Sequence, residues 1–326
     1  TEYYAPDVTF DDPLNDLDGV AAYQANVDML GGRTTFGSLL FQDSSIVLHS
    51  VKGGEVKEDG SISDITTRWT LRFTFKILPW QPTARFTGIS VYNVEPGGSQ
   101  GVLVKQQTDY WDSINIIEGG VYRQVEKGIA ISDFVNQLLP GGIQAQGAAP
   151  EVPYQLLRRG NGYEVRQYPS YTAVKIPYAR RDEGFGALGA FTNGMNPLSP
   201  AIMEVQDDET VDKTMMWPLS FAAPGQETPP NVKEAIEKSS DGQWSKCVIT
   251  TIPSQVVAVA EFTDASMEPV VRRADRQLRE FLRRDGIDVP LDSEDKVMFA
   301  QYDAIFSMGA RRGEVWIPLQ DGGHPW

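Results

Sequence analysis

Apolar and polar residues alternate at period two through much of the region up to residue 115, a pattern typical of half-buried strands. The alternation is clearest in TTFGSLLFQDSSIVLHSVKGG, DITTRWTLRFTFKILPW, ARFTGISVYNVEPGG and GVLVKQQTDYWDSINI, which are separated by Gly-rich turns. One helical stretch, GVAAYQANVDML, precedes them. The pattern predicts an α+β domain over residues 1–140, in which a short helix is followed by several strands of one sheet.

A segment of small, uncharged residues follows, IQAQGAAPEVP, and it has no periodic pattern. Pro, Gly and Ala in such a run are typical of a linker. A chain of 326 residues also favours about two domains, since single cores rarely grow much further than roughly 250 residues. We therefore predict a linker over 141–152 and a second domain over 153–326.

The second domain contains an internal repeat. PSYTAVKI at Pro169–Ile176 resembles PSQVVAVAEF at Pro253–Phe262, and each copy is followed by a helical pattern. The first helix is EGFGALGAFTNGM and the second is SMEPVVRRADRQLREFLRRDG. Two strand–helix halves of this kind, each followed by further strands, predict an α+β domain with an approximate twofold axis.

The second helix carries clear boundary signals. Ser266 is a candidate N-cap, Arg283 and Arg284 lie near the negative end of the helix dipole, and Gly286 can end the helix. The apolar stripe expected to face the core consists of Val270, Ala274, Leu278 and Phe281.

The first helix is rich in glycine, which is unfavourable in helices by up to about 1 kcal/mol each relative to alanine. Phe185, Leu188 and Thr192 share one side, which we expect to face the core. The other side is nearly bare at helical spacing and consists of Asp182, Gly186, Gly189, Ala190 and Asn193. A planar ligand or another backbone can approach such a surface closely, and tight packing on a strand is an equally good explanation of the glycines.

Composition excludes several classes of function. The formal net charge is -15, and residues 1–150 (10 basic, 18 acidic) and the remainder (19 basic, 26 acidic) are both acidic. This balance argues against a nucleic-acid backbone or an anionic membrane surface as partner. No apolar run approaches the length of a membrane span. The single cysteine, Cys247, excludes an internal disulfide framework and is expected to be structural.

Residues typical of catalysis are few. His49 alternates with Val47 and Val51 and would reach a pocket with Trp69, Tyr92 or Trp111 if that face points inward, but a strand histidine bonded to a neighbour is the expected alternative. Asp11 and Asp12 precede Pro13 and are expected to form a turn. GFGALG matches a dinucleotide-binding pattern by letters alone, because its context is not a βαβ unit.

The second domain contains an ordered set of longer motifs between Pro153 and Leu319: YQLLRRGNGYEVRQYPSYTAV, EGFGALGAFTNGMN, PSQVVAVAEF, LREFLRRDG, FAQYDAIF and RRGEVWIPL. This ordered set resembles the SOUL heme-binding family, in the version found in photosynthetic organisms. The resemblance implies a distorted eight-stranded β-barrel flanked by two helices. YAPDVTFDDPLNDLDGVAAY and TDYWD resemble an uncharacterised plant and algal domain, which implies the cone-like fold of nuclear transport factor two for residues 1–140.

The resemblance also implies where heme would lie. Basic residues that relatives carry on and near the first helix correspond here to Asp182, Ala190 and Ser307, and a proposed iron-ligating histidine corresponds to Gln167. Arg180, Arg181 or Arg311 would then hold the propionates. On steric grounds, because small residues leave room there, we expect the ring to lie on Gly186, Gly189, Ala190 and Asn193, covered by Phe306 and Met308. The iron ligand is unknown: a tyrosine, a methionine, His324 of the tail, or no protein group.

The function implied by the family is reversible, weak binding of heme or a related tetrapyrrole for carriage, buffering or regulation in a chloroplast. A protein partner in tetrapyrrole metabolism is a further expectation. The opening TEYYAPDVTFDDP is typical of the interior of a fold, so we expect a processed or truncated precursor. Two alternatives stay open: an enzyme that oxidatively opens heme or acts on a small ligand in the N-terminal domain, and a protein-interaction module that binds no pigment.

Overall fold

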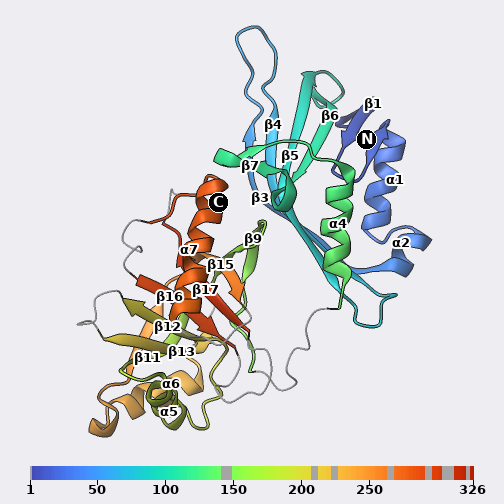
Figure 1. Ribbon diagram of the computed structural model, residues 1–326. Helices are drawn as coiled ribbons and strands as arrows, with labels where there is room; N and C mark the ends of the chain where they lie inside the picture. Colours follow the sequence, from blue (N-terminus) through green and yellow to red (C-terminus); the bar gives the residue numbers. More distant parts are fainter. Residues whose placement is uncertain are drawn as a thin grey trace. The chain divides into compact units, whose positions relative to one another are not determined.

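The structure is a computed structural model that describes residues 2–140, 149–206, 212–221, 227–262, 268–290, 296–302, 312–320 and 324–326. The chain folds into two compact units. Unit 1 consists of Thr1–Gly142, Leu157–Asn161 and Trp326, and unit 2 consists of Ile143–Leu156 and Gly162–Pro325. Each unit combines helices with a β-sheet, which confirms the α+β class (Figure 1). The linker at 141–152 stays a prediction, because residues 141–148 lie outside the described part.

Unit 1 is built on a six-stranded sheet in the order β2-β1-β6-β5-β4-β3. Its strands are β1 (Tyr4–Asp11), β2 (Asp16–Asp18), β3 (Phe41–Gly53), β4 (Ile65–Phe75), β5 (Thr83–Pro96) and β6 (Val102–Trp111). Its helices are α1 (Val20–Leu30), α2 (Thr35–Leu40), α3 (Asp112–Asn115) and α4 (Lys127–Leu138), and β7 (Ile116–Ile117) pairs with β8 (Val121–Tyr122) beside a 3-10 turn at Glu118–Gly120.

The predicted helix and the four later strands of unit 1 are confirmed, except that Thr35–Leu40, predicted as the start of the first of these strands, forms helix α2. The sequence pattern also missed β1. This strand pairs in parallel with β6 and has a register shift between Tyr4 and Thr9. Pro6 and the irregular burial pattern remove the strict alternation by which a strand is recognised. The hydrophobic core of unit 1 is largely aromatic and consists of Phe41, Trp69, Phe73, Phe75, Ala84, Phe86, Trp111 and Ala130.

Unit 2 is built on a nine-stranded sheet in the order β14-β11-β13-β12-β16-β17-β15-β10-β9. Its strands are β9 (Gln155–Arg159), β10 (Glu164–Tyr168), β11 (Tyr171–Tyr178), β12 (Ala201–Gln206), β13 (Lys213–Phe221), β14 (Val248–Ile252), β15 (Gln255–Phe262), β16 (Lys296–Gln301) and β17 (Gly313–Pro318). The later part of β9, from Leu157 on, is assigned to unit 1 although the strand pairs within this sheet. The helices are α5 (Arg181–Phe191), α6 (Pro230–Ser239) and α7 (Glu268–Arg284), with a 3-10 turn at Gly242–Trp244. Within the described ranges, unit 2 thus has one strand and one helix more than the eight strands and two helices that the family resemblance implies.

The strand order of unit 2 contains the predicted pseudo-twofold repeat. On one side of the antiparallel β12–β16 pair the order outward is β12-β13-β11-β14, and on the other side it is β16-β17-β15-β10. Strand β11 with helix α5 therefore occupies the same position in its half as strand β15 with helix α7. The PSYTAVKI and PSQVVAVAEF copies provide these two equivalent strands, β11 and β15.

Helix α7 confirms the predicted helix and its end but corrects its buried face. Of the expected stripe only Leu278 is fully buried, whereas Val271 and Leu282 replace Val270 and Phe281 as core residues. Gly286 has a φ of 69°, and the amide of Ile287 donates to the carbonyl of Leu282 at 2.9 Å, which is the expected glycine-based helix stop. Ser266 lies outside the described residues.

Cys247 is buried near the start of β14, and burial raises the pKa of its thiol. A thiol in that environment is a weak nucleophile, as expected for a structural cysteine. None of the described helices has the length and apolar composition that a membrane crossing requires.

Candidate functional site

Helix α5 positions six of the nine predicted site residues. Arg180 is its N-cap residue, the helix itself contains Arg181, Gly186, Gly189 and Ala190, and Asn193 lies two residues beyond its end. The other three predicted residues, Phe306, Met308 and Arg311, lie outside the described residues, as does Ser307. The structure therefore brings the helical half of the predicted site together.

Local interactions define both ends of α5. Asp182 and Glu183 occupy its first turn, where negative side chains interact favourably with the helix dipole. At the other end, the amide of Thr192 donates to the carbonyl of Leu188 at 2.8 Å. The ammonium group of Lys238 on α6 donates to the carbonyl of Phe191 at 2.6 Å and so satisfies a C-terminal carbonyl.

The three glycines of α5 have different surroundings. A Cβ atom on Gly184 would lie 3.1 Å from Met215 Cε and 3.2 Å from Tyr178 Cβ, so this glycine packs closely against the sheet. A Cβ atom on Gly186 would meet no atom of the described residues within 4 Å, and one on Gly189 would lie 3.9 Å from the Trp217 ring. Among the described residues, tight packing therefore explains Gly184, but it does not explain Gly186 or Gly189.

The exposed side of α5 is the one that the sequence predicted. Gly186, Ala190 and Asn193 are exposed together with Asp182, and Gly189 is half-buried. On the opposite side Leu188 is fully buried, with an exposed fraction of 0%. The helix thus presents a surface without long side chains around Gly186 and Ala190.

Aromatic side chains lie beneath this bare surface. The rings of Phe185 and Trp217 pack edge to face with centroids 5.9 Å apart. The indole nitrogen of Trp217 is buried and makes no hydrogen bond within the described structure. An apolar, aromatic base next to an open helix face is sterically suited to a planar ring.

The charges beside α5 are less favourable for an anion. Arg180 is exposed, and its guanidinium pairs with Asp182 at 2.9 Å and approaches Glu183 at 3.9 Å. The hydrogen bond from Arg180 lowers the pKa of Asp182. Propionate groups near this helix would therefore compete with two carboxylates for Arg180.

The bare surface offers no side chain that commonly ligates heme iron. Its residues are Asp182, Gly186, Gly189, Ala190 and Asn193, whereas the usual axial ligands are His, Met, Cys and Tyr. Gln167, at the position of the family's proposed histidine, is exposed on β10. The residues present thus fit the ring of a tetrapyrrole, but they do not fit axial ligation of its iron.

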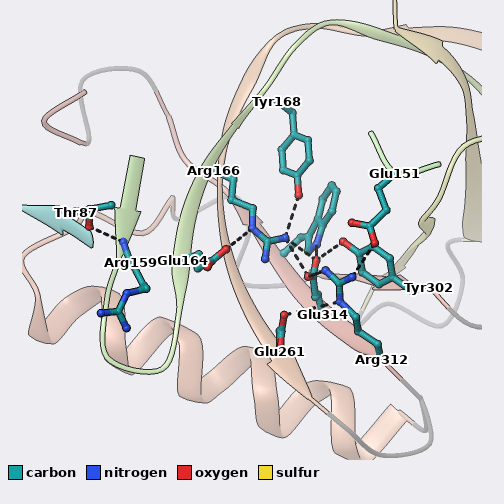
Figure 2. A network of polar contacts seen from close by, with 11 residues as sticks. Thr87, Glu151, Arg159, Glu164, Arg166, Tyr168, Glu261, Tyr302, Arg312 and Glu314 are labelled. Carbon is teal, nitrogen blue, oxygen red and sulfur yellow. Dashed lines mark hydrogen bonds and ion pairs between the residues drawn. The ribbon is translucent and has the colours of Figure 1, made fainter. Parts of the chain in front are cut away.

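A buried polar network joins strands β10 and β17 of unit 2, as Figure 2 shows. The carboxylate of Glu314 has an exposed fraction of 0% and accepts hydrogen bonds from Arg166 at 3.0 Å, Tyr302 at 2.7 Å and Trp316 at 2.9 Å. Arg312 donates to the same carboxylate at 3.1 Å and stacks on the Tyr302 ring at 3.9 Å.

The electrostatics of this network indicate a structural role. Burial lowers the pKa of Arg166, but the carboxylates of Glu314 and Glu164 outweigh it and raise the pKa overall. Burial and then Glu314 raise the pKa of Tyr302. Arg166 therefore stays charged and Tyr302 stays neutral, and the Glu314 carboxylate is already surrounded by donors. Such a cluster holds strands together and is poorly suited to exchanging protons.

The sequence analysis missed this network, although part of its signal was visible. Glu164, Arg166 and Tyr168 alternate along one strand, and Glu314 and Trp316 alternate along another. Period-two spacing places each set on one face of its strand. It does not indicate that the two strands bring these faces together.

The candidates in unit 1 are explained by local structure. His49 Nε2 is 2.8 Å from Thr70 Oγ1, and burial lowers the pKa of this histidine, so the expected alternative of a strand histidine bonded to a neighbour is confirmed. Asp12 accepts hydrogen bonds from the amides of Leu14 at 2.6 Å and Asn15 at 2.7 Å, which confirms the predicted turn. GFGALG lies inside α5, and not in a loop between a strand and a helix.

The model of the SOUL heme-binding protein family matches residues 149–318, which is more than half of the chain. This chain belongs to the SOUL family. The SOUL match includes α5, α7 and the repeated strands, so the repeat and the helix with the bare surface are both parts of the family domain.

Residues 1–101 match a second family, described as "Uncharacterized conserved protein (DUF2358)". This match confirms the predicted kinship of the N-terminal part with an uncharacterised domain. No protein with curated annotation matches the sequence.

Solved structures that resemble this SOUL protein cover about half of it. The C-terminal domain of EcmrR is 11% identical with a TM-score of 0.33, over 51% of this chain and 98% of that one. A hydrolase from Listeria innocua is 10% identical with a TM-score of 0.35, over 53% and 94%. SAV2435 bound to tetraphenylphosphonium is 13% identical with a TM-score of 0.30, over 49% and 94%.

Proposed function

We propose that this SOUL protein binds heme or a related tetrapyrrole non-covalently and reversibly, for carriage, buffering or regulation of the pigment in a chloroplast. Membership of the SOUL heme-binding family is the observation that supports this function most strongly. The open surface of α5 supports a binding place for a planar molecule. A protein of tetrapyrrole metabolism is the partner that this role implies.

Different residues of α5 would contact different parts of such a ring. Gly186, Gly189 and Ala190 leave the backbone accessible, so one face of the ring can lie directly on the helix. Phe185 and Trp217 make the base beneath Gly189 apolar. Arg180 and Arg181 are the nearest predicted partners of the propionates, and Arg180 would exchange its contacts with Asp182 for them.

The same surface predicts modest affinity. Bound heme would contribute its iron and its conjugated ring, whereas the exposed side of α5 contributes shape and apolar contact. Without an axial ligand from this surface, the gain in free energy comes mainly from burial of the ring. Reversible exchange with another protein requires affinity of this moderate kind.

The test is a titration of the full chain with hemin, followed by the Soret band. We expect a saturable Soret shift for the wild-type protein and loss of that shift in Gly189→Leu. The leucine side chain would occupy the space where the ring lies, and its Cβ atom would make only an ordinary contact of 3.9 Å with Trp217. Circular dichroism of Gly189→Leu should match that of the wild-type protein.

Gly128→Leu is the matched control. Gly128 lies in α4 of unit 1, is exposed, and has no atom of the described residues within 4 Å of a Cβ position. It should bind hemin like the wild-type protein. Equal affinity of Gly189→Leu and wild type would contradict the placement on α5, and absence of any saturable shift would contradict tetrapyrrole binding. A linear tetrapyrrole formed with reductant and oxygen would identify an enzyme instead.

A further inference from the structure

A small cleft opens inside unit 2 on the side of the sheet that carries the helices. Its volume is about 170 Å³, and its walls come from the end of β11, strands β12, β13 and β16, and the first turns of α5 and α7. This cleft is too small to enclose a tetrapyrrole, since pockets for drug-sized ligands have roughly 300–1,000 Å³. It must therefore be considered apart from the bare surface of α5.

The floor of the cleft is apolar. Val271 and Val297 have exposed fractions of 2% and 5%, and Phe299 likewise has 5%. Val205 and the ring of Tyr178 complete this lining, and burial raises the pKa of Tyr178 to about 12, so its hydroxyl stays neutral. A ligand in the cleft would place an apolar group against these side chains.

The rim of the cleft is charged and has an excess of positive side chains. Arg181, Lys213 and Arg272 line it, and Glu268 is the acidic residue among the lining side chains. Glu268 lies 3.0 Å from Arg272 and 3.6 Å from Lys213. The hydrogen bond from Arg272 lowers the pKa of Glu268, so the carboxylate is ionised at neutral pH. Among the described residues that line the cleft, three side chains are thus basic and one is acidic.

This local charge contrasts with the chain as a whole, whose formal net charge is -15. A positive rim on an acidic protein attracts small anions selectively, because the remaining surface repels them. The apolar floor favours an anion with an apolar body over inorganic phosphate or sulfate. A cavity of roughly 150 Å³ lined by apolar residues can hold a molecule the size of benzene.

We propose that this cleft binds a compact organic carboxylate whose apolar body has the size of a single aromatic ring. The ring would lie on Val271, Val297 and Phe299, and the carboxylate would face Arg272 and Lys213 at the rim. Arginine binds carboxylates with paired, charge-assisted hydrogen bonds. Glu268 makes these same contacts in the structure, so ligand and Glu268 compete for the same two cations.

Because Glu268 competes with the ligand, substitutions of Arg272 and of Glu268 should change the affinity for benzoate in opposite directions. The probe is benzoate, titrated into the full chain at low ionic strength by isothermal titration calorimetry, with benzamide as the neutral analogue of the same shape. Benzoate should bind at least about tenfold more tightly than benzamide, because a hydrogen bond to a charged group contributes more than a neutral one. Arg272→Gln should remove most of that preference.

Glu268→Gln should bind benzoate about threefold more tightly than the wild-type protein, since the competing surface ion pair is weak. Arg276→Gln is the matched control, because Arg276 is exposed one turn further along α7 and does not line the cleft. It should leave benzoate affinity unchanged. Melting temperatures of the variants close to the wild-type value establish that each is folded.

Three results would overturn the proposal: equal affinity for benzoate and benzamide, no effect of Arg272→Gln, or weaker binding in Glu268→Gln. A hemin titration in saturating benzoate tests the separation from the tetrapyrrole surface. We expect the Soret titration to be unchanged, and displacement of hemin by benzoate would show that the cleft belongs to that surface. The cleft proposal does not depend on hemin binding, so failure of either leaves the other intact.

Discussion

Helices α5 and α7 occupy equivalent positions in the two halves of unit 2, and their buried residues have the same spacing. The buried positions are Gly184, Leu188 and Phe191 of α5 with Thr192 and Met195 directly after it, and Val271, Asp275, Leu278, Arg279 and Leu282 of α7. In both sets, successive buried positions are separated by four, three, one and three residues. The fold thus fixes which positions face the sheet, and it leaves their chemistry free.

The exposed positions of the two helices differ much more. Where α5 has Gly186, Gly189 and Ala190, α7 has Arg273, Arg276 and Gln277 at the same offsets from the buried residues, and all three are exposed. Long charged side chains are therefore compatible with this position in the fold. The bare surface of α5 is therefore not required by the repeat, and the proposed contact with a planar ring would give its glycines a role.

The largest effect is expected from the buried ion pair of α7. Arg279 Nε lies 2.8 Å from Asp275 Oδ2, and both residues are buried. Asp275→Leu would leave the guanidinium buried without this partner and should reduce the free energy of unfolding by about 3–5 kcal/mol. Urea denaturation of the full chain measures this loss.

The equivalent residues of α5 suggest the rescue. Asp275→Leu combined with Arg279→Thr copies the Leu188 and Thr192 pair into α7 and removes the buried charge. The double variant should regain most of the stability, because a buried ion pair contributes little more stability than well-packed uncharged side chains in its place. If it is as unstable as the single variant, the two helices are not equivalent in packing.

A smaller loss of stability is expected when Gly184 of α5 is replaced by valine, the residue at the equivalent buried position of α7. Gly184→Val would place branched methyl groups where a Cβ atom already lies 3.1–3.2 Å from Met215 and Tyr178. Overpacking of this kind should cost about 1–3 kcal/mol of unfolding free energy. An unchanged melting temperature would show that the sheet beneath α5 can move aside.

The smallest effect is expected at Gly186, and it has the opposite sign. Gly186→Ala adds a methyl group that meets no atom of the described residues within 4 Å, and it favours the helix. Stability should rise by roughly 0.5–1 kcal/mol. Thermal unfolding followed by circular dichroism measures this gain. A loss of stability would mean that Gly186 packs against another part of the chain, which would remove the argument for a free surface.

The sequence by itself determined much of this protein at the level of local pattern. The period-two strands of unit 1, the repeated strand–helix halves, the turn at Asp12 and the bare side of α5 all follow from spacing within one segment. Hydrophobic periodicity and turn chemistry depend on neighbours along the chain, so they can be seen in the sequence. The SOUL resemblance extended that pattern to a family and a function class.

Only the tertiary structure decided which residues meet across segments. Arg166 and Glu314 are 148 positions apart and form one buried pair, and the sequence of neither strand indicates that the other will be its partner. The same holds for the cleft, whose rim combines α5, β13 and α7. It also holds for the glycines of α5, since only the position of Met215 and Tyr178 separates Gly184, which packs, from Gly186, which leaves space. Packing is a property of surfaces in contact, and one segment of sequence specifies only one of the two surfaces.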